Sequence, residues 1–330
     1  MEAKTQDIKY KTLYVPGTIK SKVSLFKRAP NNPILSPTNK WWESEAVFNP
    51  GVAEDKDGVI HIIYRAIGRD GISRFGHATT KDGFNIVDRD PEPVFEPGEN
   101  NEYEVKGVED PRIVFIDGLY YIIYTAASCY EKDEFPRLPK GDMPWRVRVS
   151  LALTKDFKEF TRHGVILPNM DNKDGVLFPE KINGKYVLLH RLPPDIWLAY
   201  SDNLRDWSDH QKVTHTRPGH WDEKRIGAGP APIKIPEGWL LLYHGADHHN
   251  VYRAGFLLLD KDHPNKVIAR SDMPALEPIE KYEKEGIVPR VVFPEGLILR
   301  NQELFMYYGA ADKYIGAAKA SLKDILASLK

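Results

Sequence analysis

The stretch VEDPRIVFIDGLYYIIYTAA (residues 108–127) contains two apolar runs separated by the short turn IDG. The second run is rich in aromatic and β-branched residues, which favour β-strands. A glycine-containing turn between two such runs is typical of a β-hairpin. Glu109, Asp110 and Arg112 stand directly before the packing residues of the first run. The stretch therefore predicts a hairpin with charged side chains at the entrance to its first strand.

The same shape recurs in four other segments. They are NPGVAEDKDGVIHIIYRAIG (49–68), KDGVLFPEKINGKYVLLHRL (173–192), GAGPAPIKIPEGWLLLYHGAD (227–247) and VVFPEGLILRNQELFMYYGAAD (291–312). A third strand-like run often follows, and a polar turn with an aromatic residue then suits a fourth, outer strand. Four antiparallel strands in each of five repeats predict an all-β, five-bladed β-propeller, because radial stacking buries the faces that one blade leaves exposed. A double β-sandwich is the alternative, which the five-fold recurrence disfavours.

Helical periodicity is scarce along the chain. SLKDILASLK (321–330) is the clearest short helix. We expect a single catalytic propeller domain over residues 1–330. About 30 N-terminal residues form an extension that packs on the propeller or closes it.

The composition is that of an ordinary globular protein, with 42% hydrophobic and 28% charged residues. Lys and Arg number 46 and Asp and Glu 47, so no basic surface for nucleic acid or an anionic membrane is indicated. The single cysteine, Cys129, excludes an intramolecular disulfide and a cysteine-based zinc site. Because the N-terminus lacks an apolar signal region, the sequence predicts a cytoplasmic protein without a membrane anchor. Adjacent histidines such as His248 and His249 point apart on a strand, so no metal site is predicted.

Polar residues at equivalent places of the repeats are expected to converge, because the inner strands of a propeller line a central channel. At the starts of first strands or the ends of second strands stand Asn49, Arg65, Asp110, Arg112, Lys173, Arg191, His244 and Asp312. Arginines offer forked donors to phosphate or carboxylate, and acids accept bonds from sugar hydroxyls or transfer protons. The set predicts an anionic cosubstrate beside a polyhydroxyl ligand.

Each of these residues also has a structural explanation when it is taken alone. EDPR reads as a polar turn before a strand, Arg65 and Arg191 can snorkel from strand ends, and His244 can be a hydrogen-bonded strand-end histidine. Neighbours on an extended strand point to opposite faces, so only one of Glu109 and Asp110 is expected to face the channel. Pro111 is expected to hold Asp110 in an extended conformation.

The sequence resembles glycoside hydrolase family 130, the mannoside phosphorylases and related β-mannosidases. The residues that carry the resemblance are NPGV (49–52), GVEDPRI (107–113), DGVLFPEKINGKY (174–186), RIGAGPAPI (225–233), GWLLLYHG (238–245), VVFPEG (291–296) and YYGAAD (307–312). In order and spacing they cover the chain from about Asn32 to the C-terminus. As a set these motifs are far more specific than DPR or YHG alone.

The resemblance implies a five-bladed propeller and inverting cleavage of a β-mannosidic bond by phosphate, which yields α-mannose 1-phosphate. It makes Asp110 the proton donor, acting through a hydroxyl of the bound mannose. We assign Asn49, Arg65, Glu109 and Asp312 to substrate binding. No metal or organic cofactor is implied, and inorganic phosphate is the cosubstrate.

Phosphate binding is assigned to Lys173, Arg191 and His244 by the same resemblance. Lys173 is a departure, because the family often has an arginine near this place, and lysine lacks the fork of arginine. Glu180 also stands where the better-known phosphorylases have an arginine.

The sequence thus predicts a phosphorylase of β-mannosides, most plausibly β-1,2-manno-oligosaccharides. An inverting hydrolase is the first alternative, because Glu109 or Glu180 would supply the extra acid that activates water. A non-catalytic carbohydrate-binding propeller is the second. The expected partners are a manno-oligosaccharide and phosphate, without nucleic acid or membrane, and a homo-oligomer is compatible with the sequence.

Overall fold

The computed structural model describes residues 24–131 and 144–329, which form strands and two short helices. The strands are β1 (Lys27–Arg28), β2 (Ala46–Glu54), β3 (Ile60–Ile67), β4 (Ser73–Thr80), β5 (Ile86–Arg89), β6 (Gly107–Ile116), β7 (Leu119–Cys129), β8 (Trp145–Thr154), β9 (Phe160–Val165), β10 (Lys173–Leu177), β11 (Tyr186–Leu192), β12 (Asp195–Ser201), β13 (Ser208–Thr214), β14 (Arg225–Ala228), β15 (Ile233–Ile235), β16 (Gly238–Ala246), β17 (Tyr252–Leu259), β18 (Val267–Arg270), β19 (Val292–Arg300), β20 (Glu303–Ala310) and β21 (Tyr314–Ser321). The helices are α1 (Lys281–Lys284) and α2 (Leu322–Ser328). The all-β prediction is confirmed, and α2 lies where the short C-terminal helix was expected.

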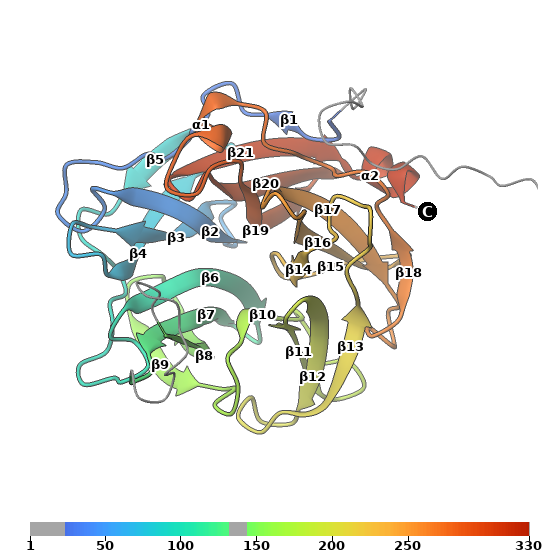
Figure 1. Ribbon diagram of the computed structural model, residues 1–330, viewed down its shortest axis with the longest axis horizontal. Coiled ribbons are helices and arrows are strands. Elements are labelled where there is room, and N and C mark those ends of the chain that lie inside the picture. Colours follow the sequence, from blue (N-terminus) through green and yellow to red (C-terminus); the bar gives the residue numbers. More distant parts are fainter. Residues whose placement is uncertain (1–23, 132–143, 330) are drawn as a thin grey trace, which may run out of the picture.

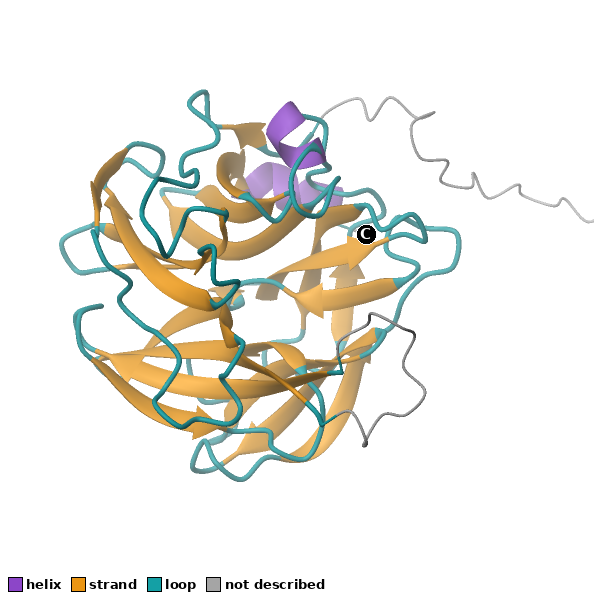
Figure 2. Cartoon of the chain, turned by 60° about the vertical axis from the view of Figure 1, so that its left-hand side comes forward, coloured by secondary structure: helices purple, strands orange, loops and turns teal. Residues whose placement is uncertain are grey.

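The strands group into consecutive antiparallel units that follow the sequence repeats. Unit 1 contains β2 to β5, unit 2 contains β6 to β9, unit 3 contains β10 to β13, unit 4 contains β14 to β18, and unit 5 contains β19 to β21 together with β1. Units 1 and 2 share one sheet through a single parallel pair, Ser73 with Gly107. Figure 1 shows the units side by side around a common centre in chain order, and Figure 2 shows the helices at one edge of the strands.

The second strand of each unit is buried on both faces. Ile62 belongs to an apolar cluster shared with unit 5, whereas its neighbour Ile63 belongs to a cluster shared with unit 2. Ile122 and Ile123 divide in the same way between units 1 and 3. Because successive side chains point to opposite faces, a strand enclosed by two neighbouring units has an unbroken apolar run. This explains the runs HIIY and YIIY.

The chain near its N-terminus completes the last unit. Residues Lys27 and Arg28 of β1 pair with Lys319 and Ala318 of β21, so β1 is the outer strand of unit 5. The predicted N-terminal extension falls mainly on residues 1–23, which lie outside the described part of the chain.

Buried tyrosine triads recur on the second strands. A tyrosine hydroxyl and an arginine bind the same buried carboxylate in Tyr64–Glu43–Arg89, Tyr124–Glu104–Arg162, Tyr243–Asp222–Arg270 and Tyr308–Glu283–Arg28. In unit 3 His190 takes this place, bonded to Asn172 and His210. A buried carboxylate needs such partners to offset its lost hydration. Since Arg28 lies on β1, the first described strand also supplies the triad of the last unit.

Candidate active site

The first strand of the units is interrupted near its start by a β-bulge. The pairing register shifts at Asn49 in unit 1, at Asp110 in unit 2, at Asp174 in unit 3 and at Glu295 in unit 5. In unit 4 the interruption separates β14 from β15, which both pair with β16. A bulge redirects a side chain next to a site. Each interrupted strand can therefore turn one polar residue toward the common centre.

Three of these bulge residues have left-handed backbone conformations. The φ angles are 49° for Asn49, 55° for Asp110 and 56° for Asp174. Asn and Asp are the residues other than glycine that adopt this region most readily, because their short polar side chains bond locally. The expectation that Pro111 keeps Asp110 extended is therefore wrong: the residue adopts the bulge conformation instead.

The bulge also brings Glu109 and Asp110 to the same partner. Arg65 donates from Nη2 to Glu109 Oε1 over 2.6 Å and from Nη1 to Asp110 Oδ1 over 3.3 Å. The strict alternation of an extended strand was expected to separate these two acids. Strict alternation does not hold here, because the register shifts between Glu109 and Arg112, but only Asp110 of the two acids lines the pocket, as expected.

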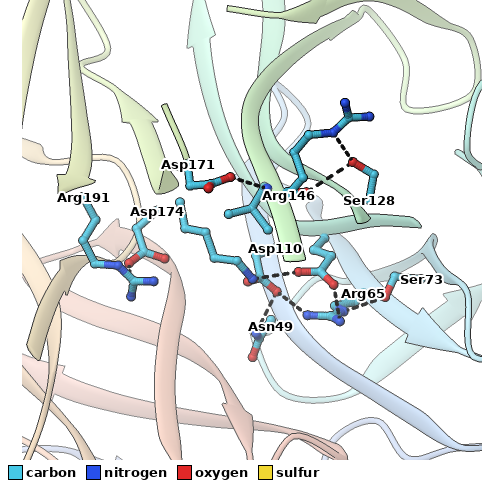
Figure 3. A network of polar contacts seen from close by, with 12 residues as sticks. Asn49, Arg65, Ser73, Asp110, Ser128, Arg146, Asp171, Asp174 and Arg191 are labelled. Carbon is cyan, nitrogen blue, oxygen red and sulfur yellow. Dashed lines mark hydrogen bonds and ion pairs between the residues drawn. The ribbon is translucent and has the colours of Figure 1, made fainter. Parts of the chain in front are cut away.

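The bulge residues open onto a pocket of about 350 Å³. It is lined by Asn49, Arg65, Asp110, Lys173, Asp174, Arg191, Arg225, Tyr252, Val288, Val291, Phe293 and Asp312. Figure 3 shows Asn49 and Arg65 directed at Asp110, with Arg191 next to Asp174. The structure thus brings six of the nine residues singled out in the sequence to one pocket, all except Glu109, Arg112 and His244. A larger pocket of about 700 Å³ lies between the turns of units 1 and 2, but the converging charges favour the smaller one.

Asp110 lies at the centre of one side of this pocket. Its Oδ1 accepts hydrogen bonds from Asn49 Nδ2 at 2.8 Å and from Arg65. Burial alone would raise the pKa of Asp110, but the positive charges of Arg65, Lys173 and Arg112 outweigh it and hold the pKa below its usual value. This carboxyl is therefore a carboxylate at neutral pH.

Glu109 lies behind this acid and does not line the pocket. It joins two cations, because Lys173 Nζ binds its Oε2 at 3.0 Å while Arg65 binds Oε1. Glu109 is thus placed to orient Arg65 and Lys173.

Asp312 is the pocket acid that retains its proton most readily. Burial raises its pKa to about 6. The nearby Asp110 also raises this pKa, whereas the positive charges of Arg65 and Lys173 lower it by a smaller amount than these two effects together raise it. Asp110 and Asp312 therefore differ in pKa, because that of Asp110 is lowered and that of Asp312 is raised, a separation typical of sites that transfer protons.

The other side of the pocket is cationic. Arg191 Nη1 lies 2.8 Å from Asp174 Oδ2. Burial opposes ionisation of Asp174, but Arg191 and His244 overcome it and lower its pKa. His244 itself is fully buried, with Nε2 at 3.4 Å from Asp174 Oδ2 and its ring against Phe293. The predicted phosphate residue His244 therefore lies behind Asp174 and does not line the pocket.

Arg225 and Tyr252 line the same side and were not predicted. Within residues 24–131 and 144–329, the Arg225 side chain makes no hydrogen bond or ion pair that would hold it. Burial raises the pKa of Tyr252, while the neighbouring charges of Arg225 and Arg191 lower it. An unpaired guanidinium beside a paired one forms a ready site for an anion.

Two further sequence interpretations concern Glu180 and metals. Glu180 lies outside the pocket, where it pairs with Lys234 at 2.5 Å on the exposed surface. It is therefore not placed to activate water at this site. In the part of the chain that the structure describes, no group of three or more His, Cys, Asp or Glu side chains is arranged to hold a metal ion. The described helices include none of the length and apolarity needed to cross a membrane.

A signal for Asp174 was present in the repeats. Asn49-Pro50, Asp110-Pro111 and Asp174-Gly175 occupy the same place in successive units, and Glu295-Gly296 follows in unit 5. Aligning the repeats at these dipeptides would have found Asp174 and Glu295. No comparable pattern marks Arg225 or Tyr252, which reach the pocket from the edges of unit 4.

Comparison with known proteins links this geometry to one enzyme family. The model of glycoside hydrolase family 130, described as beta-1,4-mannooligosaccharide phosphorylase, matches residues 23–330. A 1,2-beta-oligomannan phosphorylase of Thermoanaerobacter sp. (strain X514) is 45% identical over 91% of this chain and 98% of its own length. A beta-1,2-mannobiose phosphorylase of the same strain is 42% identical over 88% of this chain and 95% of its own.

A solved structure supports the same relationship. The beta-1,2-mannobiose phosphorylase of Listeria innocua, in complex with beta-1,2-mannobiose, has a TM-score of 0.80 and 32% sequence identity. The match covers 92% of this chain and 98% of the Listeria chain.

Proposed function

The chain belongs to glycoside hydrolase family 130, and from this we propose that it is a glycoside phosphorylase that cleaves β-1,2-linked manno-oligosaccharides with inorganic phosphate. The products are α-mannose 1-phosphate and a saccharide shortened by one residue. The observation that carries the proposal is one pocket that is lined both by the acid Asp110 and by the guanidinium groups of Arg191 and Arg225.

The β-1,2 linkage rests on the relatives. The family description names a β-1,4 activity, and a beta-1,4-mannooligosaccharide phosphorylase of Ruminococcus albus is 31% identical. The two Thermoanaerobacter phosphorylases named above share 45% and 42% identity with nearly the whole chain, and both act on β-1,2 linkages by name. We therefore give the linkage of these relatives more weight than that of the family description.

We also propose that the five units are the blades of a five-bladed β-propeller. Support comes from the apolar clusters that join every unit to its neighbours, including unit 5 to unit 1. Figure 1 shows the same circular order. In a closed ring the first strands face the axis, which accounts for the meeting of bulge residues from different units.

The reaction requires a proton on the leaving oxygen and a nucleophile on the opposite face of the sugar. In the proposed mechanism, Asp110 gives its proton through a mannose hydroxyl to the glycosidic oxygen. The bond from that oxygen to the anomeric carbon breaks while a phosphate oxygen forms the new bond. Asn49, Arg65 and Asp312 hold the mannose that is transferred.

Phosphate binding and protonation of Asp110 are linked by charge. Arg65 and Lys173 favour the ionised form of Asp110. A phosphate dianion bound nearby offsets these positive charges and so favours the protonated acid. The cosubstrate thereby prepares the proton donor, and no second carboxylate is needed to activate an anion that is already nucleophilic.

Hydrolysis is the competing function, and it needs a carboxylate that is free to activate water. Asp174 is bound by Arg112 and Arg191, and Glu109 is bound by Arg65 and Lys173. These ion pairs favour phosphorolysis. Cytoplasmic location and a homo-oligomeric state stay predictions from the sequence.

The decisive experiment compares cleavage of β-1,2-mannobiose with and without inorganic phosphate. We expect α-mannose 1-phosphate and mannose in equal amounts with phosphate, and no cleavage without it. Free mannose at the same rate in both reactions would reject phosphorolysis in favour of hydrolysis. Absence of any turnover, with saccharide binding retained, would favour the carbohydrate-binding alternative.

A further inference from the structure

Arg112 is a buried cation beneath the pocket that the proposed reaction does not use. Its side chain is 1% exposed, so it reaches neither solvent nor a bound ligand. Its Nε donates to the Gly229 carbonyl at 2.9 Å, and its Nη1 donates to the Asp110 carbonyl at 3.1 Å. Its Nη2 contacts Asp174 Oδ1 at 3.2 Å and Glu295 Oε1 at 2.9 Å. One guanidinium thus contacts the interruptions of four units.

Stability alone does not account for this arrangement. Buried ion pairs return about what their desolvation costs, and apolar residues of similar size often serve a core equally well. Here the chain buries Arg112 together with Glu295, which is 1% exposed, and Asp174, also 1% exposed. The planar guanidinium of arginine holds its hydrogen-bond donors in a fixed geometry, so it can orient the groups that it binds.

The donors of Arg112 orient the backbone of Asp110, the acid that lines the pocket. Arg112 fixes the carbonyl of Asp110, a residue with a left-handed backbone whose side chain must face the sugar. The residue also reaches Asp174 Oδ1, while Asp174 Oδ2 holds Arg191. Asp174 is therefore shared between the residue that fixes the acid and the residue proposed to bind phosphate.

We propose that Arg112 is a positioning residue, whose buried guanidinium locks the bulge of Asp110 against those of the neighbouring units and so holds the proton donor against the mannose hydroxyl that passes its proton to the leaving oxygen. This inference rests on the proposed function, because it needs Asp110 to act as the acid. Arg112 does not touch the sugar or the phosphate, and it acts through Asp110.

The test compares Arg112→Lys with wild type on two substrates in the presence of phosphate. β-1,2-Mannobiose needs a proton on its leaving group, whereas 2,4-dinitrophenyl β-mannoside does not. Lysine keeps the positive charge but loses the fork, so a pure charge effect is separated from an effect of geometry. We expect turnover of mannobiose to fall about 100-fold or more, as general-acid catalysis contributes 10²–10⁴-fold. Turnover of the aryl mannoside should fall less than about 10-fold, and the KM for phosphate should stay within about 3-fold.

A matched control is Arg89→Lys, which alters a half-buried arginine of the unit 1 tyrosine triad away from the pocket. Arg89→Lys should reduce the turnover of both substrates only slightly and by the same factor, and its main effect should be on stability. If Arg112→Lys does not fold, Glu295→Gln loosens the same guanidinium without removing it, and it should give a smaller loss with the same preference for mannobiose. Equal losses on the two substrates in either variant would overturn the positioning role.

A double-mutant comparison gives a second measurement on mannobiose alone. If Arg112 acts through Asp110, adding Arg112→Lys to Asp110→Asn should reduce the remaining turnover little further. Additive losses would reject the proposal. A failure of the proposed role of Arg112 can be distinguished from a failure of phosphorolysis. Cleavage that does not depend on phosphate would reject phosphate as the cosubstrate. A hydrolase also needs the acid Asp110, so the two-substrate and double-mutant comparisons would still test Arg112.

Discussion

Asn49 donates a hydrogen bond from Nδ2 to Oδ1 of Asp110 over 2.8 Å, and this bond joins the bulges of two neighbouring units. A side chain at Gly309 would overlap the Asn49 amide, so the close approach depends on that glycine. Arg65 also donates to this Oδ1, and among the described residues no hydrogen-bond donor binds Oδ2 of Asp110. A single carboxyl oxygen is therefore available for proton transfer.

Replacement of Asp110 by Asn should remove the proton donor without disturbing this contact network. The amide oxygen can still accept from Asn49, but the group no longer gives up a proton. We expect kcat on β-1,2-mannobiose to fall about 10²–10⁴-fold, the range for loss of general-acid catalysis. Steady-state kinetics and thermal unfolding measure the two effects. Asp202→Asn, an exposed acid on unit 3, is the control and should behave as wild type.

Replacement of Arg225 by Ala should weaken phosphate binding more than it affects stability. Its guanidinium lines the pocket without an ion pair in the described residues, so its removal leaves no buried charge behind. Loss of one charge-assisted hydrogen bond, at about 1.5–3 kcal/mol, corresponds to a KM for phosphate raised about 10- to 100-fold. Sulfate inhibition should weaken in parallel. Arg205→Ala, an exposed arginine outside this pocket, is the matched control. An unchanged phosphate KM in Arg225→Ala would place the anion elsewhere.

Replacement of Asp174 by Asn should also affect phosphate, but through Arg191. The amide can still accept from Arg112 at Oδ1, whereas the charge that holds Arg191 is lost. We expect a raised KM for phosphate with a smaller change in kcat. The neighbouring His244 provides the check, because its pKa is lowered by burial against the pull of Asp174. Removing that carboxylate should lower the pKa of His244 further, which the NMR titration of its imidazole measures.

The sequence predicts the repeated units because each one has a local signature. Both faces of Ile62-Ile63 and of Ile122-Ile123 are buried, and their unbroken apolar runs reveal it. Converging residues such as Asn49 and Asp110 could also be predicted, because they stand at the same place in the local signature of their repeats.

The rest of the site depends on geometry that spacing does not encode. A bulge changes the face on which a residue lies, so simple alternation does not explain why Asp110 lines the pocket and Glu109 does not, while both bind Arg65. Arg225 and Tyr252 are the first residues of β14 and β17, and both line the pocket because these two strands of unit 4 begin there. His244 lies behind Asp174 since the tertiary packing of Phe293 covers it. Such placements follow from how neighbouring units pack, which no single repeat specifies.

Stability should depend on pH through Asp312. Its pKa in the folded protein is raised from 3.8 to about 6, so the folded state binds this proton more tightly than the unfolded state. The contribution of Asp312 is therefore fully present below about pH 4 and is lost as the pH rises through about 6. A difference of one in pKa between the folded and unfolded states corresponds to about 1.4 kcal/mol, so the rise from 3.8 to about 6 corresponds to about 3 kcal/mol.

Asp312→Asn removes this penalty, and it should raise the free energy of unfolding at pH 7 by up to about 3 kcal/mol. At pH 4 the difference from wild type should disappear. Urea unfolding at the two pH values measures it, and an equal effect at both would contradict the raised pKa. The variant should nevertheless lose activity, since Asp312 is assigned to the bound mannose.

Arg28 should matter more for stability than its place near the start of the chain suggests. Its guanidinium donates from Nε to Glu283 Oε1 over 2.7 Å and from Nη2 to Oε2 over 2.8 Å, and Glu283 is fully buried. Removing one partner of a buried ion pair leaves the other charge uncompensated, which typically costs about 3–5 kcal/mol. Arg28→Ala should therefore lower the thermal unfolding midpoint clearly. Lys27→Ala changes the exposed neighbour on the same strand and should have little effect. Because β1 is the outer strand of the last unit, equal stability of the two variants would mean that this contact does not hold the unit together.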